Sequence, residues 1–349
     1  MKKIIKRFVD WHHWPFFPFY FPLFFVWAWY IIKSRSLWFF SSSNPTLTFG
    51  GFEGETKKEM YDLLPPGSYP KTLYIDPKIS FPDLLQLIKS HSFSFPFIVK
   101  PNVGMEGILF RKIDNEKQLE IYHAKITFDY LVQELVDFPL EIGLFYIRHP
   151  NENSGKITAL FSKKFPIITG NGISTIGEIL QKNNCKIVEE SGKLTAEELQ
   201  RILPKNETFP LSFVGNRYHG TSFHDLSELI DKSLLSVFDK LSLSSSFYYG
   251  RYDIKCASIE DLKNEINFSI LEFNGAGSIP NHVYTGNFTL IKAYKEIIGH
   301  WKSLYEISAH NYENGYIYWK FWDGLRYILK AKRNFRKQKK QDKKIRFRL

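Results

Sequence analysis

Short hydrophobic and polar runs alternate from about residue 50 to residue 312, in a pattern typical of a mixed α and β protein. The spacing predicts helices over 61–64, 82–89 and 288–309 and strands over 73–75 and 97–100. The last helix has the clearest apolar stripe, with Leu290, Tyr294, Ile297, Trp301 and Leu304 three to four residues apart. We therefore expect an α+β fold in which this stripe lies in the core.

The amino-terminal 40 residues differ, because one long run there carries no charge. The run from Phe16 to Ile32 is crowded with Phe, Trp and Tyr and has basic residues on both sides. Its length of about 17 residues is at the lower limit for crossing hydrocarbon, and Pro18 and Pro22 interrupt a helix. We expect a re-entrant or interfacial anchor on the cytoplasmic side of a membrane. The alternative is a segment packed on the protein's own surface.

Two further stretches frame the central region. Residues 41–54 are rich in small residues and glycine, and they indicate a linker. The stretch Tyr316–Leu329 predicts an aromatic helix that leads into a basic tail, which either lies on an anionic leaflet or is disordered behind a capping helix. We divide the chain into a membrane-associating segment with linker (1–49), a central domain (50–312) and a carboxyl-terminal part (313–349).

The net charge of +11 is concentrated at one end of the chain. Between Lys330 and Leu349, eleven Lys or Arg residues accompany one acid, Asp342, so the rest of the protein is nearly neutral. A nearly neutral body offers no broad electrostatic surface for a nucleic acid. The two cysteines, Cys185 and Cys256, form neither a disulfide framework nor a zinc module, which indicates a reducing compartment.

Candidate chemistry gathers in two stretches that we expect to be strands. Arg251 and Asp253 lie two residues apart in one stretch, as do Glu272 and Asn274 in the other, so each pair shares one face of its strand. If the strands pair, two carboxylates, a carboxamide and a guanidinium converge. Such oxygen ligands suit Mg²⁺ held together with phosphates, and the guanidinium suits a transferring group. A solvated sheet face with an ordinary ion pair is the alternative.

A lysine strand and a glycine-containing loop precede the acidic pair. Lys100 ends an apolar strand, and Gly104 and Gly107 follow it. Such a lysine can hold phosphate oxygens while backbone N–H groups of the loop approach closely. The chain has neither a P-loop motif nor a Gly-x-Gly-x-x-Gly motif. The informative feature is the order: lysine strand, glycine loop, a strand ending at Glu134, then the acidic pair.

In this order of elements, over roughly residues 50–300, the sequence resembles the ATP-grasp superfamily, in particular D-alanine–D-alanine ligase and its relatives. The resemblance implies an ATP-grasp catalytic domain whose two α+β lobes clamp ATP. It also implies an ATP-dependent carboxylate–amine ligase that uses Mg²⁺ or Mn²⁺, forms an acyl phosphate and releases ADP. The expected substrates are small carboxylates and amines or cell-envelope precursors.

The same resemblance assigns roles to individual residues. Lys57 and Lys100 resemble the nucleotide-binding lysines, and Arg251 resembles the arginine beside the transferred phosphoryl group. The implied metal ligands are Asp253, Glu272 and Asn274. The resemblance also implies further nucleotide contacts. These are Gly104 and Gly107 in the phosphate loop, Gln133, Glu134, Leu135 and Val136 in the adenine hinge, Glu141 as the ribose-binding acid, and Asn216 in a later asparagine motif.

Several interpretations stay open beside this one. The chain could instead be an ATP-binding scaffold or pseudoenzyme, or an ATP-grasp enzyme that acts on a lipid or envelope precursor near the expected anchor. Residues 169–176 resemble an element of peptide-forming members such as cyanophycin synthetase. His219 and His282 either orient substrate or serve as hydrogen-bonded structural residues. The sequence does not indicate an oligomeric state.

Overall fold

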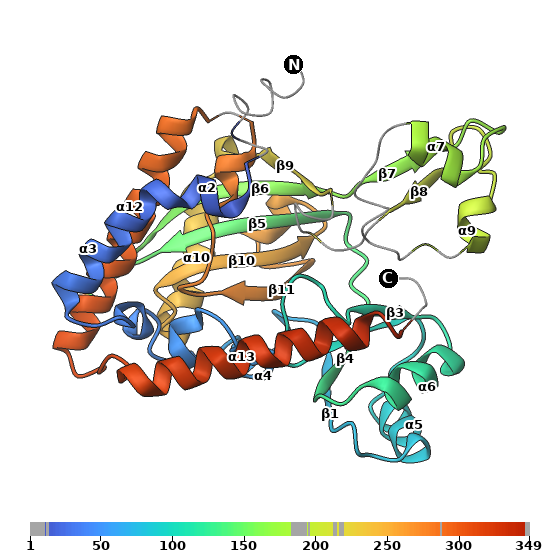
Figure 1. The fold of residues 1–349 in the computed structure, drawn as a ribbon, viewed down its shortest axis with the longest axis horizontal. Helices are drawn as coiled ribbons and strands as arrows, with labels where there is room; N and C mark the ends of the chain where they lie inside the picture. The colour runs from blue at the N-terminus through green and yellow to red at the C-terminus, as the bar shows by residue number, and fades with distance from the viewer. Residues whose placement is uncertain are drawn as a thin grey trace.

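Two larger antiparallel sheets and a small two-stranded sheet form the framework of the computed structural model (Figure 1). The structure describes residues 11, 14–182, 194, 196–211, 215, 220–286 and 288–345. The four-stranded sheet has the order β1-β4-β2-β3, and the five-stranded sheet has the order β11-β10-β5-β6-β9. Helices cover both sheets, so the predicted α+β class is confirmed.

The four-stranded sheet and two helices form the small lobe. Its elements are β1 (Thr72–Ile75), α5 (Phe81–Ser90), β2 (Phe97–Pro101), β3 (Arg111–Ile113), α6 (Glu116–Lys125) and β4 (Tyr130–Glu134). Helix α5 begins after Ser80, whose hydroxyl accepts a hydrogen bond from the backbone N–H of Asp83. Leu84 and Ile88, four residues apart on α5, share a core with Val99 of β2. The helix and the two strands expected here are confirmed.

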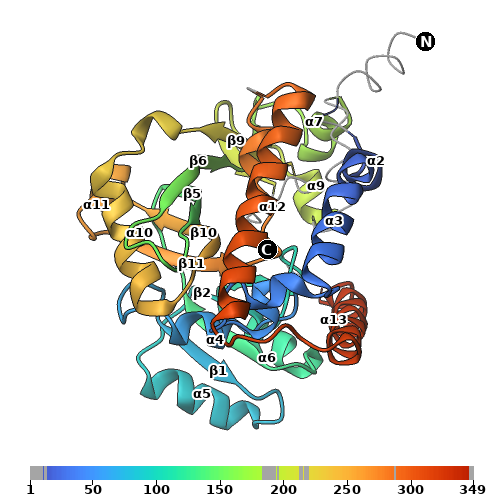
Figure 2. The ribbon, with the colours of Figure 1, turned by 90° about the vertical axis from the view of Figure 1, so that its left-hand side faces the viewer.

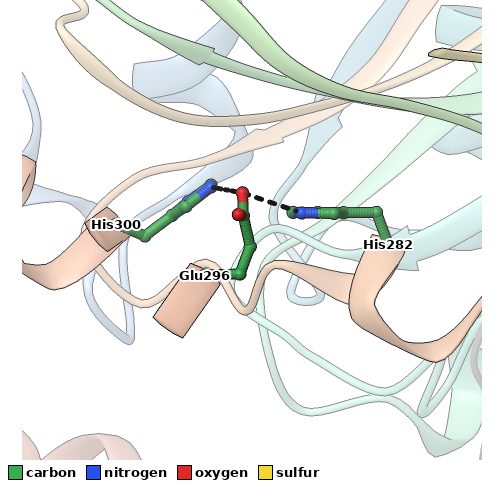
Figure 3. A group of neighbouring side chains, drawn as sticks. All are labelled: His282, Glu296 and His300. Atoms are coloured by element: carbon green, nitrogen blue, oxygen red, sulfur yellow. Dashed lines mark hydrogen bonds and ion pairs between the residues drawn. The ribbon is translucent and has the colours of Figure 1, made fainter. Parts of the chain in front are cut away.

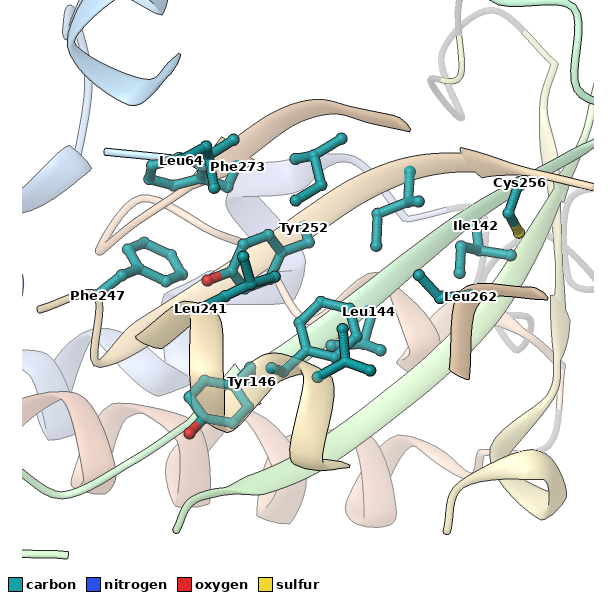
Figure 4. Packing of buried hydrophobic residues seen from close by; sticks show 14 of the residues in the cluster. Leu64, Ile142, Leu144, Tyr146, Leu241, Phe247, Tyr252, Cys256, Leu262 and Phe273 are labelled. Atoms are coloured by element: carbon teal, nitrogen blue, oxygen red, sulfur yellow. The ribbon is translucent and has the colours of Figure 1, made fainter. Parts of the chain in front are cut away.

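The five-stranded sheet is the centre of the large lobe. Its strands are β5 (Leu140–Ile147), β6 (Lys156–Lys164), β9 (Ser222–Asp225), β10 (Tyr249–Cys256) and β11 (Phe268–Asn274). On one face, Tyr252 and Cys256 pack with α10 (Lys232–Ser245) and α11 (Ile259–Lys263), as Figure 4 shows for part of this core. On the other face, Tyr249 packs with α12 (Leu290–Glu313). Figure 2 shows α10 and α12 on opposite sides of this sheet.

Helix α12 confirms the long helix expected over 288–309, and the amino-terminal elements pack on it. These are α2 (Phe16–Tyr20), η2 (Phe21–Leu23) and α3 (Phe24–Ser34). Tyr30 stacks on Tyr305 with ring centroids 4.8 Å apart, and Trp27 meets Trp301 edge-on at 5.0 Å. The alternative of packing on the protein's own surface therefore holds for one side of this segment. Among the described residues, no helix combines the length and apolar character needed to cross a membrane.

The stretch 41–54 is not the linker that its composition indicates. It forms η3 (Phe39–Ser42) and η4 (Thr48–Gly51), and its serines and Asn44 are buried. Asn44 accepts hydrogen bonds from the backbone N–H groups of Tyr248 and Tyr249, at 2.8 and 3.0 Å, and donates to the carbonyl of Gly50. Small polar residues are used here because they satisfy buried backbone groups in little space. Composition alone does not separate that use from a linker.

The basic end of the chain is helical and docked, which corrects the expected boundaries and tail. Helix α13 begins at Phe321 and continues to Asp342, not over 316–329. Near its start, Trp38 donates a hydrogen bond from its indole to the carbonyl of Phe321. Near its end, Asp342 pairs with Arg111 of the small lobe at 2.9 Å. Helix α13 runs along both lobes (Figure 1). The basic side chains of α13 point to solvent, and a few of its other side chains bind it to the lobes.

The two-stranded antiparallel sheet of β7 (Ile167–Thr169) and β8 (Thr208–Pro210) packs with α7 (Ile176–Lys182) and α9 (Ala196–Gln200) around a small core of its own. Short segments elsewhere are α4 (Lys57–Asp62), η6 (Ser227–Leu229) and η7 (Asn281–Tyr284).

Candidate functional site

Strands β10 and β11 pair, which meets the condition on which the expected convergence of their polar side chains depends. Arg251 lies opposite Asn274 and Asp253 lies opposite Glu272 in the antiparallel register. Residues directly opposite each other in such a pair project from the same face of the sheet, so all four polar side chains share one face. The opposite face carries Tyr252 and its buried apolar neighbours.

Asp253 lies between two cations. Arg251 donates to it through Nε and Nη2, each at 3.0 Å, and Lys163 Nζ of β6 lies 3.1 Å from its Oδ1. Lys163 also contacts Glu141 of β5 at 3.1 Å. Burial alone raises the pKa of Asp253, but the charges of Arg251 and Lys163 outweigh burial and hold that pKa below its ordinary value. Asp253 is therefore an ionised carboxylate in a buried position.

Lys57 links the glycine loop to β11. Its ammonium lies 3.2 Å from Glu272 and 3.4 Å from the carbonyl oxygen of Gly104, and its backbone N–H donates to the carbonyl of Asn102. Thr56 caps helix α4 by accepting from the N–H of Glu59, which fixes Lys57 as the first residue of the helix. The predicted phosphate lysine thus meets one predicted metal ligand.

Among the residues that the structure describes, Lys100 of β2 has neutral oxygen partners alone within hydrogen-bonding distance. Its Nζ lies 3.2 Å from the hydroxyl of Tyr61 and 3.4 Å from the carbonyl of Leu271. Gln133 Nε2 donates to the same tyrosine oxygen at 3.0 Å. Burial, with a smaller contribution from the charge of Lys57, lowers the pKa of Lys100 to about 7. No carboxylate of the described residues contacts this ammonium directly, although Glu272 and Glu141 act on it at longer range, and it is suited to an incoming anion.

We call Lys57, Lys100, Glu141, Lys163, Arg251, Asp253 and Glu272 the inter-lobe site, because they come from both lobes and α4. Helix α4 and strand β2 contribute from one side, and β5, β6, β10 and β11 contribute from the other. Its contacts run from Glu141 through Lys163, Asp253 and Arg251 on the large sheet, and from Glu272 through Lys57 to the glycine loop.

The other predicted site residues lie nearby or elsewhere. Glu134 and Leu135 are exposed where the chain leaves the small sheet for β5, and the carbonyl of Val136 accepts a hydrogen bond from Lys255. Gly107 lies in the loop after β2 with a positive φ of 68°, a conformation that favours glycine. Asn216 and His219 lie outside the described residues.

The motif at 169–176 has a local structural role. The Asn171 side chain accepts hydrogen bonds from the N–H groups of Ile173 and Ser174. Thr175 and Glu178 then form reciprocal side-chain to backbone hydrogen bonds at the start of α7.

Sequence reasoning missed two members of this region. Lys163 precedes Lys164 at the end of β6, where consecutive lysines are typical of a solvated strand end, and only the alternation with Phe161 signals its inward face. Glu55 lies two residues before Lys57, and its Oε2 is buried without a hydrogen-bond partner among the described residues. Burial raises the pKa of Glu55 to about 7. No spacing in the sequence marks Glu55.

The donor set fits a hard divalent cation. Asp253 and Glu272 provide carboxylate oxygens on neighbouring strands, and Asn274 lies on the same face. The Nδ2 of Asn274 is buried and has no hydrogen-bond partner among the described residues, so its amide can turn its oxygen toward a cation. Oxygen donors of this kind are the ones that Mg²⁺ and Mn²⁺ prefer.

Solved structures similar to this chain include a D-alanine–D-alanine ligase from Bacillus anthracis, with 15% identity and a TM-score of 0.40 over 74% of this chain and 69% of that one. A VanG D-Ala:D-Ser ligase from Enterococcus faecalis shows 11% identity and a TM-score of 0.38 over 68% of this chain and 57% of that one. The ATP-grasp ligase PsnB shows 13% identity and a TM-score of 0.36 over 70% and 60%.

This chain thus spans 57% of the VanG ligase and 60% of PsnB. No protein-family model matches the sequence, and no curated protein matches it. The three structures named above are of ligases by name, and one is named an ATP-grasp ligase. At this degree of similarity, the function of the chain rests on the geometry of its own site.

Proposed function

We propose that this protein is an ATP-dependent carboxylate–amine ligase of the ATP-grasp type. The observation that supports it is the inter-lobe site, where four cations and three carboxylates come together. Cations in excess of acids suit a triphosphate, and the acids suit the metal that accompanies it. A surface with ordinary ion pairs does not explain why Lys100 is buried beside neutral oxygens.

In the proposed complex, each residue has a defined task. Lys57 and Lys100 hold phosphate oxygens, and the segment from Gln133 to Val136 lies where adenine would bind between the lobes. Asp253, Glu272 and Asn274 would hold Mg²⁺ or Mn²⁺, which supplies charge neutralisation on the phosphates when bound.

The proposed reaction is a phosphoryl transfer followed by an acyl transfer. A substrate carboxylate oxygen attacks the γ-phosphorus of ATP, the bond to the β-phosphate oxygen breaks, and ADP leaves. An amine then attacks the acyl carbon, phosphate leaves, and the amine gives up a proton. Arg251 stabilises charge on the transferred group, and Lys163 holds Asp253 and Glu141 in place. Catalysis of this kind depends on positioning and electrostatics.

Release of ADP by the full-length protein tests this proposal. Mg-ATP would be supplied with pools of amino acids, dipeptides and envelope precursors. We expect ADP release that requires one pool and that Glu272→Gln abolishes without unfolding the protein, because the variant lacks one metal-binding charge. Glu120→Gln, at an exposed position on α6, is the matched control. Normal turnover by folded Glu272→Gln would contradict the proposal, as would ATP binding without turnover in every pool, which would indicate a scaffold.

We further propose that the protein lies against the cytoplasmic surface of a membrane. One side of the α2–α3 segment is exposed, and its large apolar residues are 53 to 72% accessible: Phe17, Phe21, Phe24, Phe25, Trp29 and Ile32. No acid occurs between Trp11 and Phe52. Cations line the outward side of α13, which lies at the carboxyl-terminal end of α3 (Figures 1 and 2). Exposed aromatic side chains beside cations suit an anionic bilayer surface.

Sedimentation with lipid vesicles tests this surface. We expect the full-length protein to bind vesicles containing phosphatidylglycerol more tightly than vesicles of phosphatidylcholine alone. The double variant Phe24→Ser/Trp29→Ser should bind at least about 10-fold more weakly, because two large apolar side chains no longer enter the interface. The double variant Ile173→Ser/Ile291→Ser removes apolar residues that are at least as exposed and lie outside the α2–α3 segment, and it should bind normally. Equal binding by both variants, or a dimer that Phe24→Ser/Trp29→Ser dissociates, would contradict the membrane assignment.

A further inference from the structure

Two histidines and a glutamate meet behind the loop that follows β11. His282 belongs to η7, and Glu296 and His300 lie one turn apart on α12. Figure 3 shows the two imidazole rings on either side of the carboxylate. Glu296 Oε1 lies 3.2 Å from His282 Nε2 and 3.3 Å from His300 Nε2. One ligand atom from each residue lies within 4.8 Å of the others.

The cluster is buried, and its own contacts do not satisfy it. His282 and His300 are 5% and 3% exposed. Among the described residues, Nδ1 of both rings and Nε2 of His300 have no hydrogen-bond partner, although that Nε2 lies close to Glu296. A buried polar atom left without a partner raises the free energy of the folded protein. A metal bound through Nε2 of both rings would give His300 Nε2 the partner that hydrogen-bond geometry does not provide.

The walls of the cluster are aromatic, and one side is open. The His300 ring meets Phe145 edge-on with centroids 4.4 Å apart, and His282 contacts Phe288 at 5.6 Å. The side chain of Glu296 is 34% exposed, which gives an approach from solvent. The rings are thus held rigidly by packing while the carboxylate side can admit a small ion.

We propose that His282, Glu296 and His300 bind a divalent transition-metal ion of the Zn²⁺ class. Two imidazole nitrogens and one carboxylate oxygen form a donor set that Zn²⁺ accepts, whereas Mg²⁺ prefers oxygen alone. Bonds of about 2.0 to 2.2 Å around tetrahedral Zn²⁺ place ligand atoms roughly 3.4 Å apart. The two N to O distances of 3.2 and 3.3 Å match that spacing. The three side chains leave a fourth position for water on the open side.

The position of this metal site gives it a structural task. The loop from Gly275 to Asn281 connects β11 to His282, and its Ile279 carbonyl lies 3.5 Å from Arg251 Nη1. A metal that joins His282 to α12 fixes the carboxyl-terminal end of this loop to the helix. The site therefore supports the position of Arg251, and its existence does not depend on the proposed ligase activity.

Metal binding by the full-length protein tests this inference. After chelator treatment and dialysis, Zn²⁺ and Co²⁺ would be added and bound metal counted by elemental analysis. We expect one high-affinity Zn²⁺ per chain, a higher melting temperature with Zn²⁺ than with Mg²⁺, and a tetrahedral Co²⁺ absorption spectrum. Glu296→Gln and His282→Gln should each weaken Zn²⁺ binding at least about 100-fold, because each removes one of three ligands.

A second pair of neighbouring histidines, one of which lies on α12, provides the control. His310 of α12 lies against His149, with ring centroids 4.9 Å apart, and its replacement in His310→Gln should leave the stoichiometry and the Co²⁺ spectrum unchanged. If the buried His282→Gln variant does not fold, Glu296→Gln at its partly exposed position still decides the question. No Zn²⁺ binding, or binding that His310→Gln removes and Glu296→Gln does not, would overturn the proposal.

Discussion

The two sides of the inter-lobe site differ in how their buried lysines are compensated. On the large-lobe side, Lys163 contacts the carboxylates of Asp253 and Glu141, which outweigh burial and raise its pKa. On the small-lobe side, Lys100 meets a hydroxyl and a carbonyl, and burial lowers its pKa to about 7. The charged form of the lysine side chain is thus stabilised at position 163 and destabilised at position 100.

This difference indicates a division of labour. A balanced ionic network, as around Asp253, is built before any ligand binds and holds its members in fixed positions. A buried ammonium without a contacting acid, such as Lys100, raises the free energy of the ligand-free protein. Binding of an anion lowers that free energy again. We therefore assign phosphate capture to the small-lobe side and metal and transfer chemistry to the large-lobe side.

The largest expected effect comes from breaking the balanced side at its centre. Asp253→Asn removes the acid that Arg251 and Lys163 share, so ADP release should fall by about 10³-fold. The fold should survive, because asparagine keeps the shape of the side chain. Steady-state kinetics and circular dichroism measure the two effects. Asp323→Asn on the surface of α13 is the control, and loss of activity in both variants would sink the assignment.

Removing the cation on the same side should reduce stability. Lys163→Met leaves Asp253 and Glu141 buried without their common partner, which should lower the free energy of unfolding by about 3 to 5 kcal/mol. Urea denaturation measures this change. Lys164→Met, at the exposed neighbouring position, should change stability by no more than about 0.5 kcal/mol. An unchanged free energy of unfolding in Lys163→Met would show that the ionic network is not a fixed unit.

The same substitution at Lys100 should act in the opposite direction. Lys100→Met replaces an uncompensated buried ammonium by an apolar side chain of similar length, and the protein should become more stable by about 1 to 4 kcal/mol. ATP binding should weaken at the same time. Urea denaturation and calorimetry measure the two quantities. Destabilisation together with normal ATP binding would remove the distinction between the two lysines.

A smaller effect should appear in the pH dependence of stability. Because the pKa of Lys100 is about 7 in the folded protein and the ordinary pKa of a lysine is 10.5, the unfolded chain binds more protons between those pH values. Stability from this group therefore rises as pH increases from 7 to 10. The advantage of Lys100→Met over the native protein should shrink across that range in urea titrations. An advantage that is independent of pH would show that Lys100 is not the titrating group.

Much of the site could be predicted from local alternation in the sequence. The pairing of β10 with β11 follows from polar residues two apart, and the stripe on α12 follows from helical spacing. Lys163 was missed because its partner Asp253 is distant in sequence and its neighbour Lys164 is solvated. Contacts of that kind have no signature in local pattern.

Two larger errors have the same physical origin. The stretch 41–54 has the composition of a linker. Its Asn44 is nevertheless buried and forms hydrogen bonds to residues 204 and 205 positions away in the sequence. The basic run after Lys330 should repel itself, yet Asp342 and Gln338 anchor α13 to Arg111 and to the carbonyl of Val103. Tertiary contacts override composition in both places.

Calorimetric titration of the full-length protein with ATP, with and without Mg²⁺, tests the central claim most directly. The two-sided site predicts binding that Mg²⁺ strengthens, that Lys100→Met weakens in either condition, and that loses its Mg²⁺ dependence in Asp253→Asn. Absence of ATP binding, or binding indifferent to Mg²⁺ and to both substitutions, would contradict the account.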